Sequence, residues 1–252
     1  MRKIKNFVIV GTQRTGSSAL AEAIGLHPDI ACGWEWTQYN TPRWKKLTNA
    51  QRALNGDFSR LLPGHRKYIT KVFNPNKTWL GYRRLFGANN KWIVHPRFSP
   101  SLWWDRLEDH ITWFQNQNDI HIIHIVRHNE IDWLKSKFIA RKAKSFRGKS
   151  YPEGIKVKIP INEAILRLRA KDWIDTRLST LIDSNPYLQL SYEDLFEDID
   201  SVAAKAVEFL DCDSSLLKSV ERHTKKQSKG SPTDYILNYD ALAAKITTRK
   251  KA

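Results

Sequence analysis

A short stretch near the N-terminus, FVIVGTQRTGSSAL, restricts the fold more than any other part of this 252-residue chain. It begins with an uninterrupted apolar run, Phe7–Val10, which is typical of a buried strand. A loop bounded by Gly11 and Gly16 follows, and then a helical pattern. In such a unit the loop N–H groups and the N-terminus of the helix form a cradle for a phosphate group. The stretch therefore predicts an α/β fold with an anion site at the carboxyl end of its first strand.

The loop lacks the lysine that grips a nucleotide triphosphate, because Ser17 stands at that position. Arg14 lies earlier in the loop, and Thr15, Ser17 and Ser18 supply hydroxyl groups. A cradle with an arginine and hydroxyls, but without the lysine and magnesium clamp, suits an anion of lower charge density than a triphosphate. The alternative is a tight turn between strand and helix that binds no ligand.

Further strand and helix patterns alternate along the chain. Strands are predicted at Lys5–Val10, Tyr68–Phe73, Trp92–Val94, Ile120–Val126 and Tyr187–Leu190. Helices are predicted from Ser99-Pro100 past Phe114, over Glu130–Arg141, over Asn162–Asp183, and after a cap at Asp200 or Ser201. The alternation predicts three layers, α/β/α, around a central, mostly parallel sheet.

The chain shows no internal repeat and no low-complexity linker, so we expect a single domain over 1–252. Within it, the basic segment 140–160 is predicted to be a mobile loop, either a lid over an anionic ligand or a solvated excursion. Residues 224–252 form a C-terminal segment.

The composition narrows the cellular and chemical context. The net charge of +16 favours an anionic partner, whether a small phosphorylated molecule or nucleic acid. The apolar run at the N-terminus is too short for a signal peptide, and no stretch approaches the roughly 18 apolar residues of a membrane span. Cys32 and Cys212 form neither a disulfide framework nor a zinc pattern. We therefore expect a cytoplasmic protein without a metal site.

A second informative segment is IHIIHIVRHNEIDWLKSKFIARK, residues 120–142. Its predicted strand ends at Arg127, and the following helix carries Ser136. An arginine at the end of a strand and a serine on the next helix can together hold a second phosphate near the same edge of the sheet. The alternative is an arginine paired with a surface acid and a serine facing solvent.

The two segments together resemble the sulfotransferases that use 3′-phosphoadenosine 5′-phosphosulfate (PAPS). The matching residues are Arg14-Thr15-Gly16-Ser17-Ser18, then Arg127 and Ser136, and then Tyr192-Glu193-Asp194-Leu195. The likeness is greatest to bacterial carbohydrate sulfotransferases of the nodulation-factor type. It implies an enzyme of EC 2.8.2 type that moves the sulfuryl group of PAPS to an acceptor hydroxyl, leaves the bisphosphate PAP, and needs no metal.

The resemblance also implies roles for particular residues. The loop would bind the 5′-phosphosulfate, with Arg14 on the leaving phosphate as a catalytic group. Its binding residues are Gln13, Arg14, Thr15, Gly16, Ser17 and Ser18. Arg127 and Ser136 would bind the 3′-phosphate, Tyr192 would lie near the adenine, and Lys229 would close over the 3′-phosphate. Ser136 follows Arg127 by nine positions where eight is common, so His128 remains an alternative to Arg127.

The reaction also needs a base for the acceptor hydroxyl. Glu35, between Trp34 and Trp36, matches the glutamate that some bacterial members place after a His-Pro-x-Ile segment. His95 is the alternative base, and Lys71 could face either the acceptor or the sulfuryl group. Stacking tryptophans and the resemblance favour a glycan acceptor, while another small molecule with a free hydroxyl stays open.

Two other functions are compatible with parts of the sequence. A P-loop small-molecule kinase would depend on ATP and magnesium, and the missing lysine argues against it. A basic nucleic-acid-binding protein would explain the charge, but the chain contains no recognised nucleic-acid module. We therefore expect no nucleic-acid partner, and the oligomeric state stays open.

Overall fold

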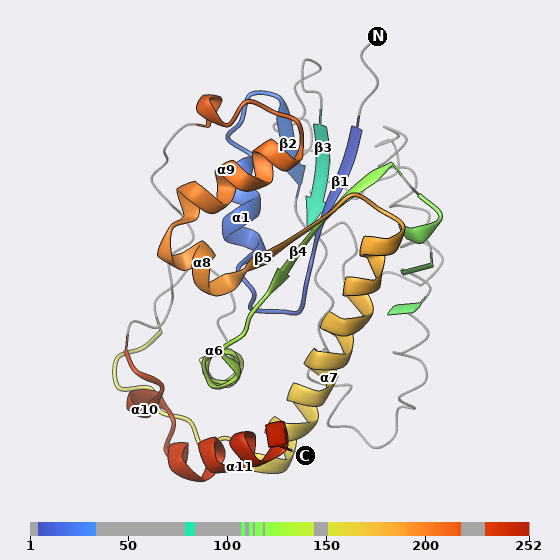
Figure 1. The fold of residues 1–252 in the computed structure, drawn as a ribbon. Coiled ribbons are helices and arrows are strands. Elements are labelled where there is room, and N and C mark those ends of the chain that lie inside the picture. Colours follow the sequence, from blue (N-terminus) through green and yellow to red (C-terminus); the bar gives the residue numbers. More distant parts are fainter. Residues whose placement is uncertain are drawn as a thin grey trace, which may run out of the picture.

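The computed structural model contains one sheet of five parallel strands in the order β2-β3-β1-β4-β5 (Figure 1). The structure describes residues 5–33, 79–83, 107–108, 111–112, 114–117, 119–143, 151–217 and 230–251. The strands are β1 (Lys5–Val10), β2 (Ile30–Gly33), β3 (Trp79–Arg83), β4 (Ile120–Val126) and β5 (Tyr187–Ser191). The predicted parallel sheet is thus confirmed.

The strands β1, β4 and β5 agree with the predicted ranges, although β5 ends at Ser191 rather than Leu190. The short strands β2 and β3 were not predicted. The predicted strands Tyr68–Phe73 and Trp92–Val94 lie outside the described residues.

Helices fill the segments between and after the strands. They are α1 (Ser17–Ile24), α6 (Glu130–Lys142), α7 (Ile161–Ser179), α8 (Tyr192–Glu197), α9 (Ile199–Phe209), α10 (Pro232–Tyr235) and α11 (Tyr239–Lys251). A 3-10 turn, Thr180–Asp183, completes the helix predicted over Asn162–Asp183. Part of the helix predicted before Phe114 is described, and there the residues are helical.

The predicted cap of the fourth helix was wrong by two or three positions. The helix α9 begins at Ile199, and the side chain of Asp198 accepts a hydrogen bond of 3.0 Å from the N–H of Ser201. Asp198 therefore occupies the capping position, while Asp200 lies in the first turn, where its charge favours the positive end of the helix.

Alternate residues of β1 point to opposite faces of the sheet, as the period of a strand requires. Phe7 and Ile9 pack with α1 and α9 on one face, whereas Val8 and Val10 pack with α7 and with the helical residues before Phe114 on the other. All four of these β1 side chains are fully buried. The core therefore consists of two helical layers around the sheet, which confirms the predicted three-layer α/β/α fold.

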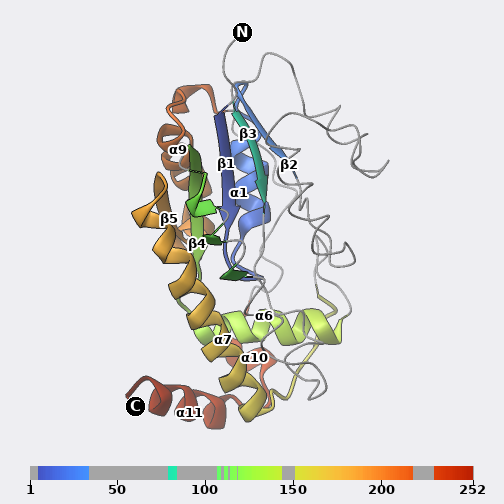
Figure 2. The same ribbon diagram turned by 90° about the vertical axis from the view of Figure 1, so that its right-hand side faces the viewer.

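The helix α6 lies across the carboxyl ends of the strands, below the sheet in Figure 2. It packs in a third cluster with the first half of α7, with α11 and with the buried side chains of Val157 and Ile159. Its residues from Trp133 to Ala140 are all buried. This helix forms the floor of the region where a parallel sheet places its ligands.

The segment predicted to be a mobile loop over 140–160 makes several contacts where the structure describes it. Its first residues belong to α6, and residues 144–150 lie outside the described residues. In the remainder, the N–H of Val157 donates to Tyr235, and the N–H of Leu237 donates to Val157 in return. The C-terminal segment thus pairs with the second half of the basic segment at Val157, and the mobility of the segment stays a prediction.

Candidate functional site

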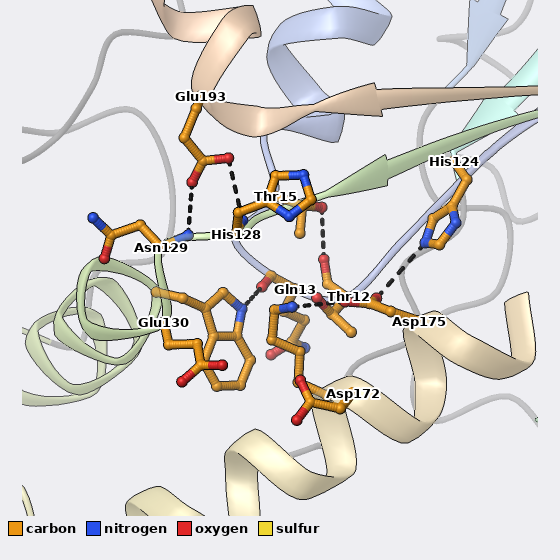
Figure 3. A network of polar contacts seen from close by, with 12 residues as sticks. Thr12, Gln13, Thr15, His124, His128, Asn129, Glu130, Asp172, Asp175 and Glu193 are labelled. Carbon is orange, nitrogen blue, oxygen red and sulfur yellow. Dashed lines mark hydrogen bonds and ion pairs between the residues drawn. The ribbon is translucent and has the colours of Figure 1, made fainter. Parts of the chain in front are cut away.

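The loop after β1 folds as a tight cradle because three of its residues have positive φ. These are Gly11 at 154°, Arg14 at 70° and Gly16 at 83°. A Cβ atom at Gly11 would lie 2.6 Å from the carbonyl oxygen of Ile125, so only glycine lets the loop pass this close to β4. The hydroxyl of Thr15 donates to the carbonyl of Thr12 at 2.8 Å and closes the turn (Figure 3).

Arg14 links the loop to two distant parts of the chain. Its Nε donates to the hydroxyl oxygen of Ser136 at 2.9 Å, and its terminal nitrogen donates to the hydroxyl of Tyr151 at 3.1 Å. The hydroxyl of Tyr151 lies 3.5 Å from the carbonyl oxygen of Ser136. The loop, the second turn of α6 and the basic segment therefore meet at one guanidinium group.

Arg127 follows β4 and lies behind the same loop. Its side chain is 3% exposed, and one terminal nitrogen donates to the carbonyl of Arg14 at 3.1 Å. The guanidinium stacks on the ring of Tyr192, 3.8 Å from its centroid. Burial lowers the pKa of Arg127, although an arginine remains charged at neutral pH. Its Nε has no hydrogen-bond acceptor within the described parts of the chain.

The start of α8 packs directly on the loop. A Cβ atom at Gly16 would lie 2.8 Å from Leu195 and 3.0 Å from Phe196, so glycine is required here for space as well as for its φ. The ring of Tyr192 also packs on Phe196, with 4.6 Å between the ring centroids. Burial, the largest influence, raises the pKa of Tyr192.

Glu193 holds the turn that carries Arg127. Its carboxylate accepts from the backbone N–H groups of His128 at 3.2 Å and Asn129 at 3.0 Å (Figure 3). Burial alone would raise the pKa of Glu193, but the N–H donors of Asn129 and His128 lower it overall. The side chain of His128 is exposed, whereas Arg127 is buried against the loop. The geometry therefore favours Arg127 over His128 as the residue that contacts the loop and could bind an anion there.

The helix α6 is fixed to the loop at its first turns. Asn129 caps it by accepting the N–H of Asp132 at 2.9 Å. The indole N–H of Trp133 donates to the carbonyl of Gln13 at 2.8 Å. Farther along, Lys135 pairs with Asp132 at 2.7 Å and donates to the carbonyl of Gly230 at 3.3 Å.

A polar group is also buried on the other face of the sheet, beneath the loop. A ring nitrogen of His124 and the hydroxyl of Tyr187 lie 2.6 Å apart. The other ring nitrogen is 3.7 Å from the carboxylate of Asp175 (Figure 3). Asp175 pairs in turn with Lys171 at 2.7 Å. His124 is fully buried, so it belongs to the core.

The structure thus brings together the loop, Arg127, Ser136 and Tyr192, which the sequence analysis took from three separate motifs. Ser17 is buried and Ser18 half-buried at the start of α1. Other predicted site residues, namely Glu35, Lys71, His95 and Lys229, lie outside the described residues. Their roles stay predictions.

Three residues of the site were missed by the sequence analysis. Tyr151 was assigned to a mobile loop, and Trp133 and Lys135 were read as part of a helix without a role. Nothing in their local sequence indicates these contacts, because each partner is about 95 to 140 residues away. One signal in the sequence could have indicated Trp133 and Lys135. The helix that carries them follows a strand ending at Arg127, and a helix in that position passes near the loop.

The arrangement can bind an anionic group. Backbone N–H groups at the start of α1, the guanidinium of Arg14 and the cation of Arg127 all lie around the loop. Among the described residues, no group of three or more histidine, cysteine, aspartate or glutamate side chains could hold a metal ion. No helix within the described ranges has the length and apolar character of a membrane span.

Comparison with known proteins gives two kinds of likeness. Residues 6–215 match the sequence profile of a family described as "Sulfotransferase family". No curated protein sequence matches the chain. Among solved structures, a sulfotransferase from Alicyclobacillus acidocaldarius is similar with 15% identity over 97% of this chain and 94% of that chain, at a TM-score of 0.46. The sulfotransferase domain of the Synechococcus PCC 7002 olefin synthase is similar with 19% identity over 89% of this chain and 81% of that chain, at a TM-score of 0.44. A retinol dehydratase in complex with androsterone and inactive cofactor PAP is similar with 11% identity over 98% of this chain and 81% of that chain, at a TM-score of 0.45.

Proposed function

The chain belongs to the sulfotransferase family, and on this premise we propose that it moves the sulfuryl group of PAPS to a hydroxyl of a carbohydrate acceptor. The family gives the class of reaction, which is sulfuryl transfer. The identity of the donor and of the acceptor is our proposal. It is supported by the residues that meet at the loop after β1.

The observation that carries the proposal is the meeting of Arg14 with Ser136. Nε of Arg14 lies 2.9 Å from the Ser136 hydroxyl oxygen, while Arg127 supports the same loop from behind through the carbonyl of Arg14. A donor with two anionic groups, the 5′-phosphosulfate and the 3′-phosphate, needs two neighbouring cationic subsites. Arg14 with the loop N–H groups would form the first, and Arg127 with Ser136 the second.

The residues present fit such a donor. The buried Nε of Arg127 has no acceptor among the described residues, so a donor phosphate oxygen would complete its hydrogen bonding. Gly11 and Gly16 let the loop pack closely against β4 and α8, which holds the cradle in its tight conformation. Tyr192 is buried between Arg127 and Phe196, so we propose that it lies near the adenine as a support for Arg127 and not as a stacking surface.

When bound, PAPS supplies an activated sulfuryl group on a phosphate leaving group. Arg14 is held by the hydroxyls of Ser136 and Tyr151, so its charge is fixed in place before the negative charge on the leaving phosphate develops. The N–H groups at the start of α1 add a second fixed positive potential. We propose that these groups stabilise the transfer without a metal ion.

The acceptor side is proposed from the sequence. Glu35 would accept the proton of the attacking hydroxyl, with His95 as the alternative base. The flanking tryptophans Trp34 and Trp36 provide stacking surfaces that suit a sugar ring. A cytoplasmic location is consistent with the use of PAPS, and we propose it on that ground.

Ligand binding and turnover test the proposal separately. PAP should raise the melting temperature by mass action, whereas ATP with magnesium and an oligonucleotide should not. A clear shift with ATP and magnesium but none with PAP would overturn the choice of donor. Transfer of labelled sulfate to a panel of oligosaccharides, lipid alcohols and phenols, with and without a chelator, would then test the acceptor class and the absence of a metal. Sulfation of phenols alone would contradict the carbohydrate proposal.

The two alternative functions have lost their support. A kinase or a nucleic-acid-binding protein would not be expected to match the sulfotransferase profile over residues 6–215. The positive charge is instead explained by an anionic donor, for which the site already contains several cations.

A further inference from the structure

Two neighbouring lysines of α6 are both buried, but they differ in their partners. Lys135 is 1% exposed and Lys137 is 4% exposed. Lys135 pairs with Asp132 and donates to the carbonyl of Gly230. Lys137 has neither a carboxylate nor a hydrogen-bond acceptor among the residues that the structure describes, and its ammonium group lies over the ring of Trp133, 4.3 Å from the centroid. A buried charge without a counterion is costly unless a ligand completes it.

The surroundings of Lys137 are cationic. The groups whose charges act on it are Arg14 in the loop and Arg167 on α7, and both are positive. Glu163, the acid that pairs with Arg167, accepts from Arg167 at 2.6 Å and from Arg141 at 2.8 Å. No carboxylate therefore remains for Lys137 among the described residues, and the charges that act on it from Arg14 and Arg167 are both positive.

Lys137 lies close to the part of the loop that contains Arg14. Lys137 directly follows Ser136, whose hydroxyl accepts from Arg14. It also lies one helical turn after Trp133, whose indole N–H donates to Gln13. The side chain thus rests on the residue that joins α6 to the loop, next to the predicted position of the phosphosulfate.

We infer that Lys137 is a donor-binding residue, which provides a second cation beside Arg14 for the anionic 5′ end of the donor and takes up a proton when this anion binds. The inference rests on the proposed function, because it assumes a donor with an anionic 5′ group. In the unliganded protein, burial and the charges of Arg167 and Arg14 lower the pKa of Lys137 to about 7. At about pH 8 the amine is then mostly neutral, and an arriving anion raises its pKa and recruits a proton.

Calorimetric titration with PAP tests this inference. At about pH 8, binding to the wild-type protein is measured in two buffers of different ionisation enthalpy, which gives the number of protons taken up. We expect roughly 0.5 to 1 proton per PAP for the wild type. Lys137→Met should abolish this uptake and weaken PAP binding by about 10- to 100-fold. Lys137→Arg should also abolish the uptake, but keep the affinity within about fivefold, because arginine stays charged.

A matched control is Lys205→Met, which removes an exposed lysine from α9 and should behave as the wild type. Equal proton uptake by the wild type and Lys137→Met would overturn the inference, and so would unchanged affinity in Lys137→Met. If Lys137→Met fails to fold, Lys137→Arg tests the inference alone. Proton uptake that persists in Lys137→Arg would show that another group takes up the proton and would overturn the inference. A wild-type protein that binds PAP without uptake refutes only the role of Lys137, whereas one that binds no PAP refutes the proposed donor.

Discussion

Nε of Arg14 lies 2.9 Å from the hydroxyl oxygen of Ser136, although 122 positions separate the two residues. The contact joins the loop after β1 to the helix after β4. Both elements start at the carboxyl ends of adjacent parallel strands, since Val10 is paired with His124. The topology of the sheet therefore creates this contact, and the two anion subsites that the sequence analysis kept apart share one hydrogen bond.

The hydroxyl of Ser136 is expected to orient Arg14 toward the donor. Ser136→Ala removes the acceptor of the Arg14 Nε and should weaken PAP binding about five- to tenfold, the effect of one hydrogen bond of about 1 kcal/mol. Isothermal titration measures this change. Ser215→Ala, which removes an exposed hydroxyl bonded to Asp213, is the matched control. Unchanged affinity in Ser136→Ala would remove Ser136 from the binding site.

Arg127 should not be replaceable by lysine. Its guanidinium stacks on Tyr192 and donates to the carbonyl of Arg14 at the same time, which requires a planar group with several donors. We expect Arg127→Lys to lower PAP affinity by at least about tenfold, or about 1.4 kcal/mol. A thermal-shift titration measures the effect, and Arg169→Lys on the exposed face of α7 serves as control. A lysine variant with wild-type affinity would show that only the charge matters.

The sequence alone predicted those parts of the fold that local patterns determine. The apolar run of β1 and the glycines of its loop impose their conformation within a few residues, and the pattern of α6 is equally local. Ile30–Gly33 gave no signal, because four residues that include a cysteine and a glycine carry too little strand preference. In the folded chain all four residues are paired with β3, a contact that lies about 50 positions away in the sequence.

The cap of α9 and the contacts of Tyr151 illustrate two further limits. Asp198, Asp200 and Ser201 are all good capping residues, so only the φ and ψ angles of the folded chain decide which one precedes the first turn. Tyr151 follows a run of basic residues and has no hydrophobic period around it. Its contact with Arg14 depends on tertiary packing between the basic segment and α6, which the local sequence does not encode.

Glu193 is expected to stabilise the turn before α6 in a manner that depends on pH. Its folded-state pKa is lowered, so its stabilising contribution is present above the ordinary pKa of 4.5 and is lost as the pH falls through the lower folded value. Glu193→Gln should reduce the free energy of unfolding at pH 7 by about 1 to 3 kcal/mol, because the amide is a weaker acceptor for two backbone N–H groups. Urea denaturation between about pH 3 and 7 measures it.

The difference between Glu193→Gln and the wild type should shrink toward the acidic end of that range, because the protonated carboxyl group resembles the amide. Asp194→Asn replaces the neighbouring, exposed acid and should show a smaller and less pH-dependent change. A difference between Glu193→Gln and the wild type that stays constant with pH would mean that the charge of Glu193 does not contribute.

Gly16 and Gly154 separate the effect of space from the effect of φ. Both have positive φ, 83° and 69°, but a Cβ atom at Gly16 would lie 2.8 Å from Leu195 and 3.0 Å from Phe196, while nothing lies within 4 Å at Gly154. Gly154→Ala should therefore cost only about 1 to 2 kcal/mol of unfolding free energy for the strained backbone. Gly16→Ala adds overpacking against α8 and should cost about 2 to 5 kcal/mol in total. Chemical denaturation compares the two variants, and equal costs would mean that α8 yields to the added methyl group.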